Sequence, residues 1–239
     1  MKAMILSAGL GSRLYPYTKN KPKALVQINN KTQLEIVIMR LIKYGFHDII
    51  INIHHFASQI IDYLNANNNF GCSITISDES DCLLDTGGGM KKAAWFFDDG
   101  NPFLVHNVDV YTTLDLTQLY QAHQKADTLA TLAVKSRTTT RPFLINSENI
   151  ICGWRNTSTG EERIVREEDQ PLTPIGFSGI QVLHPKLFSY ITEEGTFSMT
   201  DVYLRLAEDH DILAFHHDDD VWIDMGKKEN LQKVKEFIV

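Results

Sequence analysis

The sequence has no apolar run approaching the roughly 20 residues that a membrane-spanning helix requires. Its apolar start, MKAMIL, is too short for the core of a signal peptide, so we expect neither a targeting segment nor a membrane partner. Only three cysteines occur, and they form no CxxC pair or disulfide-like framework: Cys72, Cys82 and Cys152. Unpaired thiols are typical of a reducing compartment, so these absences predict a cytoplasmic protein.

Acidic residues are missing from residues 1–34, although the whole chain has a formal net charge of −7. That segment holds six cationic side chains: Lys2, Arg13, Lys19, Lys21, Lys23 and Lys31. An acidic protein as a whole is not expected to bind nucleic acid. A basic segment on such a protein instead indicates a local anion site, and we take Arg13 and Lys23 as its candidates.

Strand and helix patterns alternate through the first half of the chain. Short apolar segments predict strands at residues 2–6, 48–54, 72–77, 102–107 and 128–134. Helical periodicity and capping residues predict helices between them, at residues 32–45, 56–66, 89–97 and 116–125. This rhythm predicts an α/β fold, a Rossmann-like three-layer sandwich whose mostly parallel, mixed sheet carries helices on both faces.

The pattern changes after Ser136. Residues 143–154 predict an antiparallel hairpin, and polar, proline-containing sequence follows it, so we expect residues 137–175 to form a small peripheral hairpin subdomain. A strand at 176–185, a helix at 200–210, a strand at 221–225 and a closing helix at 227–239 complete a single domain over residues 1–239. No internal repeat and no hexapeptide-repeat tail is present.

The glycine loop GLGSRL, residues 9–14, starts like a dinucleotide fingerprint but has Leu14 in place of the third glycine. Pro16 and Pro22 interrupt any helix after it, and no Gly-Lys-Ser/Thr of a P-loop follows. A glycine turn at the end of a strand remains, whose N–H groups can hold phosphate beside the Arg13 fork and the Lys23 charge. From the spacing alone, a plain tight turn is nearly as good an interpretation.

Five motifs, in this order along the chain, narrow the choice of protein family. AGLGSRLYP with KPKALV, LLDTGGGMKKA, LVHNVDVYT, GFSGIQVLHP and VWIDMGKKENL together resemble the nucleotide-sugar pyrophosphorylases, which are nucleoside-triphosphate:sugar-1-phosphate nucleotidyltransferases. Within that family the set is most similar to the N-acetylmuramate-1-phosphate uridylyltransferases, followed by mannose-1-phosphate guanylyltransferase-like proteins. The resemblance implies an enzyme whose substrates are a nucleoside triphosphate and a sugar 1-phosphate and whose products are an NDP-sugar and pyrophosphate.

The same resemblance assigns the reacting centre. Arg13 and Lys23 would act on the phosphates, and Asp109 and Asp224 would hold Mg²⁺. The attacking phosphate is already ionised at neutral pH because its second pKa is near 6, so no general base is required. An ordinary cap or salt-bridge role is the alternative for each aspartate taken alone.

The resemblance also assigns the two substrate ends. Residues expected to contact the nucleotide are Leu6, Ser7, Ala8, Gly9, Gly11, Ser12, Glu79, Asp85, Thr86, Gly87 and Asn107. Those expected on the sugar side are Ser178 and Gly179, with Glu167 or Glu168. The chain departs from the pattern where VREEDQP replaces a Glu-Lys-Pro segment, and where Val108 replaces the usual glycine before the metal-binding aspartate.

We predict UTP and N-acetylmuramic acid 1-phosphate as substrates, a step of cell-wall recycling, in a monomer or small homo-oligomer. Glu79 keeps GTP open, because a carboxylate can accept hydrogen bonds from the guanine edge. Val108 keeps a weakly active regulatory paralogue open, and a metal-dependent glycosyltransferase is a third reading. The run HHDDD, residues 216–220, and the pair His54-His55 are interpreted as strand ends rather than metal sites. Trp222 is interpreted as a core residue, with a place bordering the sugar as the alternative.

Overall fold

The computed structural model describes residues 1–238, through which a ten-stranded sheet runs. One half of this sheet is parallel, with strands in the order β5–β4–β1–β6. These four strands are β1 (Lys2–Leu6), β4 (Asp48–Ile53), β5 (Ser73–Asp78) and β6 (Phe103–Asn107). The predicted strands at these places are confirmed, because isoleucine-rich runs of this length suit strands that are covered on both faces.

Antiparallel pairing begins at β12 (Thr173–Leu183), which lies beside β6 and also pairs with β8 (Ala130–Lys135). The first residues of β12 pair with β9 (Phe143–Ile145), and β8 pairs in parallel with β13 (Ile212–His216). The predicted hairpin is present as β9 with β10 (Ile151–Asn156), and β11 (Glu161–Ile164) extends it. The sheet is therefore mixed, as predicted, whereas β11 was not predicted and β13 was indicated only by the strand end assigned to residues 216–220.

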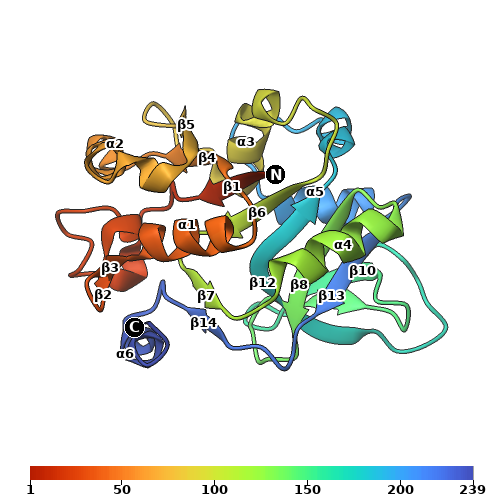
Figure 1. The fold of residues 1–239 in the computed structure, drawn as a ribbon. Helices are drawn as coiled ribbons and strands as arrows, with labels where there is room; N and C mark the ends of the chain where they lie inside the picture. Colours follow the sequence, from red (N-terminus) through yellow and green to blue (C-terminus); the bar gives the residue numbers. More distant parts are fainter. Residues whose placement is uncertain (239) are drawn as a thin grey trace.

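Helices cover both faces of the sheet, which confirms the three-layer architecture (Figure 1). Successive residues of β1 show the division, since Ala3 and Ile5 belong to one core and Met4 and Leu6 to the other. The first core lies under α1 (Gln33–Lys43), α2 (Ala57–Ala66) and α4 (Leu116–Ala126). The second lies under α3 (Asp85–Lys92), α5 (Met199–Leu206) and the short helix η5 (Pro185–Tyr190).

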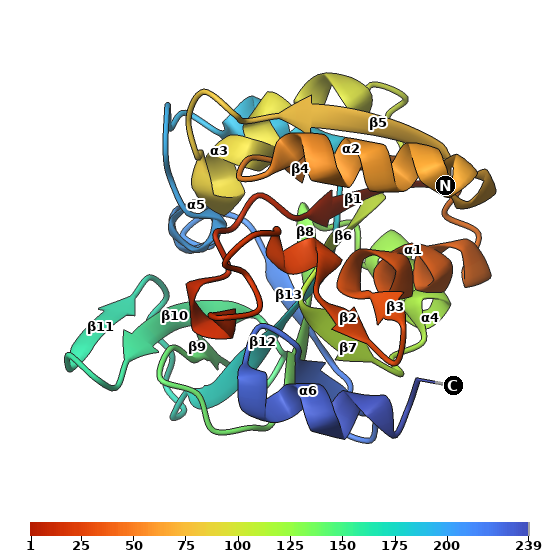
Figure 2. The same cartoon turned by 90° about the vertical axis from the view of Figure 1, so that its left-hand side faces the viewer.

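A third apolar cluster joins the N-terminal segment of the chain to its C-terminal segment, and Figure 2 shows these two segments next to each other. Leu14 and Ile28 from the N-terminal segment pack there with Met225 and with Leu231 of α6 (Lys228–Lys235). Other elements near this cluster are η1 (Ser12–Leu14), η2 (Lys23–Leu25), β2 (Gln27–Ile28), β3 (Lys31–Thr32), β7 (Val110–Thr112) and β14 (Trp222–Asp224). The cluster therefore brings the glycine loop against the C-terminal strand β14.

The predicted helix at 89–97 begins earlier, at Asp85, and its end is a separate turn, η4 (Ala94–Phe96). Three consecutive glycines have poor helix propensity, so the sequence pattern placed the start too late. Tertiary packing outweighs this low helix propensity and requires glycine at position 87, because a Cβ there would collide with the ring of Phe197. Only glycine lets α3 approach that segment so closely. The remaining short helix is η3 (Asn68–Gly71).

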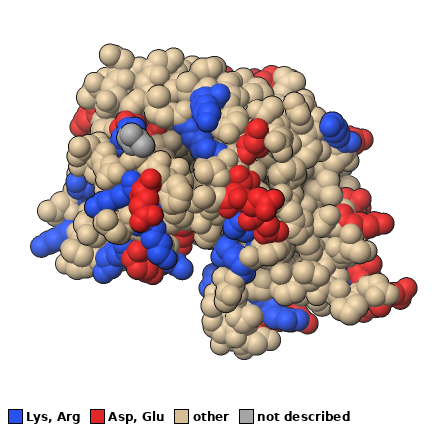
Figure 3. Space-filling view, turned by 60° about the horizontal axis from the view of Figure 1, so that its bottom comes forward, with Lys and Arg blue, Asp and Glu red and all other residues tan. Residues whose placement is uncertain are grey.

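Surface charge is mixed on the face seen in Figure 3, where cationic and acidic side chains alternate over the described residues. No described helix has both the length and the apolar character needed to cross a bilayer.

The division of residues 1–239 into one domain with a peripheral part at 137–175 stays a prediction, although β9, β10 and β11 do extend outward from β12.

Val108 follows β6 directly and is completely buried, on the side of the sheet covered by α1 and α4. Its N–H donates to the carbonyl of Leu6, at 3.1 Å, so its backbone still continues the sheet pairing. The side chain that replaces the usual glycine therefore fills the core and does not crowd the carboxylate of Asp109.

Replacing Val108 by glycine should lower the free energy of unfolding by about 2–4 kcal/mol, because a buried valine side chain is lost and backbone entropy is gained. Urea unfolding of the two proteins measures this difference, and Val108→Ala should lie between them. A loss under about 1 kcal/mol in the glycine variant would contradict the burial argument.

Three histidines are almost completely buried: His106, His123 and His217. Burial lowers the pKa of each imidazole to about 4, from an ordinary value of about 6.5 in the unfolded chain. The unfolded state therefore binds more protons between those two values, so stability present above pH 6.5 is lost as the pH falls toward 4.

The free energy of unfolding should thus fall by about 3 kcal/mol or more between pH 7 and pH 5. Urea titrations at the two pH values measure it. His123→Gln removes one titrating group away from the cavity, and its pH-dependent loss should be about 2 kcal/mol smaller. An unchanged slope in that variant would mean that His123 is protonated in the folded protein.

Candidate active site

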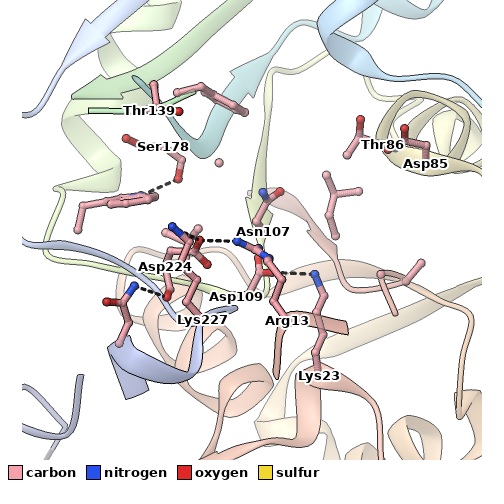
Figure 4. A pocket seen from close by; sticks show the side chains of 18 of the residues that line it. Arg13, Lys23, Asp85, Thr86, Asn107, Asp109, Thr139, Ser178, Asp224 and Lys227 are labelled. Atoms are coloured by element: carbon pink, nitrogen blue, oxygen red, sulfur yellow. Dashed lines mark hydrogen bonds and ion pairs between the residues drawn. The ribbon is translucent and has the colours of Figure 1, made fainter. Parts of the chain in front are cut away.

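Two ion pairs stand at the carboxyl end of the parallel strands. Lys23 Nζ lies 3.0 Å from Asp109 Oδ2, and Arg13 Nη1 lies 3.0 Å from Asp224 Oδ2. Figure 4 shows each cation pointing at its carboxylate. The structure thus brings together all four residues predicted for the reacting centre, although these lie up to 211 residues apart in the chain.

Asp109 is held ionised in this arrangement. Burial alone would raise the pKa of its carboxyl group, but the nearby charge and hydrogen bond of Lys23 bring that pKa below the ordinary value. The side chains of Lys23 and Asp109 are each only 13% exposed, so water screens their attraction weakly.

The two carboxylates converge on Gly226. A Cβ atom built on this glycine would lie 2.9 Å from Asp109 Oδ2 and 2.9 Å from Asp224 Oδ1, so these oxygens are at most twice that distance apart. Pairing of β14 with β7 sets this position by placing Asp224 opposite Val110. The Gly226 N–H also donates to Asp224 Oδ1, at 2.9 Å.

This donor set fits a hard divalent cation, since carboxylate oxygens are its preferred protein ligands. The described part of the chain holds no group of three or more His, Cys, Asp or Glu able to bind a metal. Two carboxylates alone suit Mg²⁺, which usually keeps its other positions for phosphate oxygens and water.

A cavity of about 720 Å³ opens beside these pairs. One end is lined by residues that follow β1 and begin α3, and Figure 4 shows Asp85 and Thr86 there. Predicted nucleotide residues that line the cavity are Leu6, Ala8, Gly9, Asp85, Thr86 and Asn107. Ser7, Gly11, Ser12 and Gly87 do not line it, although the first three belong to the loop beneath it.

Asn52 lines the same end and was missed from the sequence. It lies opposite Leu6 in the neighbouring parallel strand β4, as Asn107 lies opposite Leu6 in β6, and this shared position is a signal that could have identified it. Its Oδ1 accepts a hydrogen bond from the Ser7 N–H at 2.6 Å, which fixes the start of the glycine loop.

Glu79 lies behind this wall rather than in the cavity, contrary to the expectation that its carboxylate faces the base. It is completely buried, and Glu79 Oε1 accepts a hydrogen bond from Asn52 Nδ2 at 2.8 Å. Its other oxygen accepts from the Leu84 N–H at 3.2 Å. Glu79 therefore orients Asn52 and the start of α3.

The opposite end of the cavity contains the sugar-side residues Ser178 and Gly179. The pairing of β12 with β8 shifts register between Phe177 and Gln181, and Gly179 adopts a left-handed φ of 73°. This bulge, which favours glycine, turns the strand backbone toward Asn107.

Neighbouring side chains orient Ser178. Its Oγ lies 2.7 Å from His217 Nε2, and its carbonyl accepts from Trp222 Nε1 at 2.9 Å. His216 does end β13 as expected, but His217 is buried beneath the cavity and is not a solvated residue. Trp222 lines the cavity and also packs on the first core. Further lining residues that the sequence did not indicate are Arg137, Thr138, Thr139, Thr140, Lys227 and Asn230.

Glu167 and Glu168 are not brought to this end. Both are exposed, and Glu168 accepts a hydrogen bond from Asn146 Nδ2 at 2.7 Å. They follow β11, the outermost strand of the antiparallel extension, so the chain carries them away from Ser178.

Known proteins share both sequence and fold with this chain. An N-acetylmuramate alpha-1-phosphate uridylyltransferase from Neisseria meningitidis is 30% identical over 227 residues, covering 95% of this chain and 93% of the relative. A UTP–glucose-1-phosphate uridylyltransferase from Synechocystis is 29% identical over 95% of this chain, which spans 60% of that relative's length.

The solved structure of a UDP-glucose pyrophosphorylase from Acinetobacter baumannii superposes with a TM-score of 0.80 at 18% identity, covering 98% of this chain and 91% of the other. That likeness confirms the fold. The sequence model of the family described as nucleotidyl transferases matches residues 2–239. The chain, with its paired cations and carboxylates at the sheet end, therefore belongs to the nucleotidyl transferase family.

Proposed function

We propose that this protein transfers a nucleotidyl group from a nucleoside triphosphate to a sugar 1-phosphate and releases pyrophosphate. The observation that carries this proposal is the cavity itself, in which two cations and two carboxylates stand between two differently lined ends. Bringing two anions together and stabilising a pyrophosphate leaving group requires positive charge at that position.

Arg13 and Lys23 supply this charge from the chain. The guanidinium of Arg13 suits bidentate contact with the triphosphate oxygens, and the Lys23 ammonium acts as a point charge near the α-phosphorus. An oxygen of the sugar phosphate attacks that phosphorus as pyrophosphate leaves, and no proton has to be removed from the nucleophile.

Asp109 and Asp224 would hold Mg²⁺, which, when bound, neutralises developing charge on the phosphate oxygens. In the ligand-free structure the same carboxylates pair with Lys23 and Arg13. With substrate and metal bound, Lys23 and Arg13 would contact phosphate oxygens, and the two carboxylates would hold the metal cation in their place.

For the specific substrates we propose UTP and N-acetylmuramic acid 1-phosphate. The Neisseria relative of that name matches over nearly its whole length, which supports the choice. The position of Glu79 supports it as well, because its buried carboxylate does not face the cavity where it would read a guanine edge. A cytoplasmic location and a monomer or small homo-oligomer belong to the same proposal.

Removing either proposed metal carboxylate should abolish most of the activity. Asp109→Asn and Asp224→Asn should each lower turnover by at least about 10²-fold, the scale observed when a transition-state charge partner is lost. Pyrophosphate release at saturating Mg²⁺ measures this. Asp62→Asn makes the same change at an exposed position of α2 and should leave turnover within about twofold. Undiminished activity in excess chelator would contradict the metal assignment.

Initial rates with UTP and GTP, each combined with N-acetylmuramic acid 1-phosphate and mannose 1-phosphate, test the substrates. We expect the UTP and N-acetylmuramic acid 1-phosphate pair to be at least about tenfold faster, since pocket groups discriminate by a kcal/mol or more. A preference for GTP with mannose 1-phosphate would overturn the substrates and keep the reaction. Binding without pyrophosphate release would instead favour a regulatory paralogue.

A further inference from the structure

Arg137 is a cation of the cavity that the proposed chemistry does not use. It lies two residues after the end of β8, and its guanidinium lies over the ring of Trp222, 4.1 Å from the ring centroid. Arg137 Nη2 donates to the carbonyl of Phe177 at 2.7 Å. A stacked and hydrogen-bonded guanidinium presents its remaining N–H groups in a fixed direction.

Close packing holds the stem of this side chain as well. A Cβ built on Gly176 would lie 2.8 Å from Arg137 Cγ and 2.9 Å from its Nε, so the side chain rests on the bare backbone of β12. Nε is buried there without a hydrogen-bond partner. The position is therefore built for this residue and is not a solvent-exposed loop cation.

Arg137 lacks an anion. Within residues 1–238 no carboxylate forms an ion pair with it, whereas Arg163 pairs with Asp201 and Arg205 with Glu193. Asp224 is the acidic group that favours its charge, but that carboxylate already contacts Arg13 and lies 3.9 Å from Lys227. A partly buried charge without a partner is costly, and a ligand oxyanion would remove that cost.

The location of Arg137 indicates which substrate would supply the anion. Trp222 and Asp224 are two residues apart on β14 and so face the same side of the strand. A guanidinium over Trp222 therefore lies on the Ser178 side of the reacting centre, away from the end formed by Ala8 and Thr86.

We propose that Arg137 is a specificity-determining residue that binds an oxyanion of the sugar substrate. This inference rests on the proposed function. Two groups have this chemistry: the 1-phosphate itself and a carboxylate carried by the sugar ring. N-acetylmuramic acid 1-phosphate has both groups, whereas N-acetylglucosamine 1-phosphate has the same ring with the phosphate alone. The two compounds therefore distinguish the sources.

The test compares Arg137→Met with the wild type on both sugar phosphates at saturating UTP. Methionine keeps the packed stem and removes the charge. We expect the KM for N-acetylmuramic acid 1-phosphate to rise about 10- to 100-fold, equivalent to about 1.4–2.8 kcal/mol, with the KM for UTP within about twofold. An equal rise for N-acetylglucosamine 1-phosphate assigns the phosphate to Arg137, and a rise confined to the acidic sugar assigns the carboxylate.

Arg141→Met is the matched control, because Arg141 is exposed on the same loop and forms no ion pair in the described structure. It lines a second cavity that Arg137 also borders, but it does not line the cavity beside the ion pairs. The control variant should leave both sugar KM values within about twofold. An unchanged sugar KM in Arg137→Met, or an equal rise in the control, would overturn the proposal.

Binding measured without turnover keeps this test separate from that of the proposed function. N-acetylmuramic acid 1-phosphate should raise the thermal midpoint of the wild type and raise that of Arg137→Met much less. Arg137→Lys keeps the charge without the fork and should recover part of the shift. A wild type that releases no pyrophosphate with any substrate would contradict the reaction. An active wild type whose Arg137→Met variant binds sugar equally well would contradict this inference alone.

Discussion

The pairing of two cations with two carboxylates is the interaction on which the arrangement of the segments around the cavity depends. Lys23 and Arg13 come from the N-terminal loop, Asp109 from the end of β6 and Asp224 from the C-terminal strand β14. Because the Lys23–Asp109 pair is largely shielded from water, removing one partner would leave the other charge buried and costly. The pairs therefore hold three distant segments in one place.

Close backbone approaches make room for this centre. Gly226 lies where the two carboxylates and Arg13 converge, and a Cβ there would lie 2.9 Å from an atom of each, so these charged groups would have to shift. On the sugar side, the bulge in β12 turns Ser178 and Gly179 out of regular pairing, and Gly176 gives Arg137 a surface to rest on. The sheet thus loses regular strand pairing where substrates would enter. Beta-bulges are common beside functional sites.

Local patterns were sufficient for much of the fold and indicated the four charged residues that meet at the sheet end. The parallel strands and the helices between them follow from periodicity, and the placement of Asp109 follows from its position after a buried strand. Local patterns failed for β7 and β11, which are only three and four residues long and so leave little periodicity to detect. They also failed for the start of α3, where packing against Phe197 outweighs the poor helix propensity of three glycines.

The sequence by itself determined the class of fold, the family and the charged residues of the centre, because apolar periodicity and ordered motifs are local properties of the chain. Tertiary structure alone decided which polar residues reach the cavity. Glu79 is turned inward by its bond to Asn52, and Glu167 is carried away on the antiparallel extension. Arg137 is brought in by its contact with Trp222. Strand register and side-chain direction set these positions, and both depend on contacts between segments far apart in sequence.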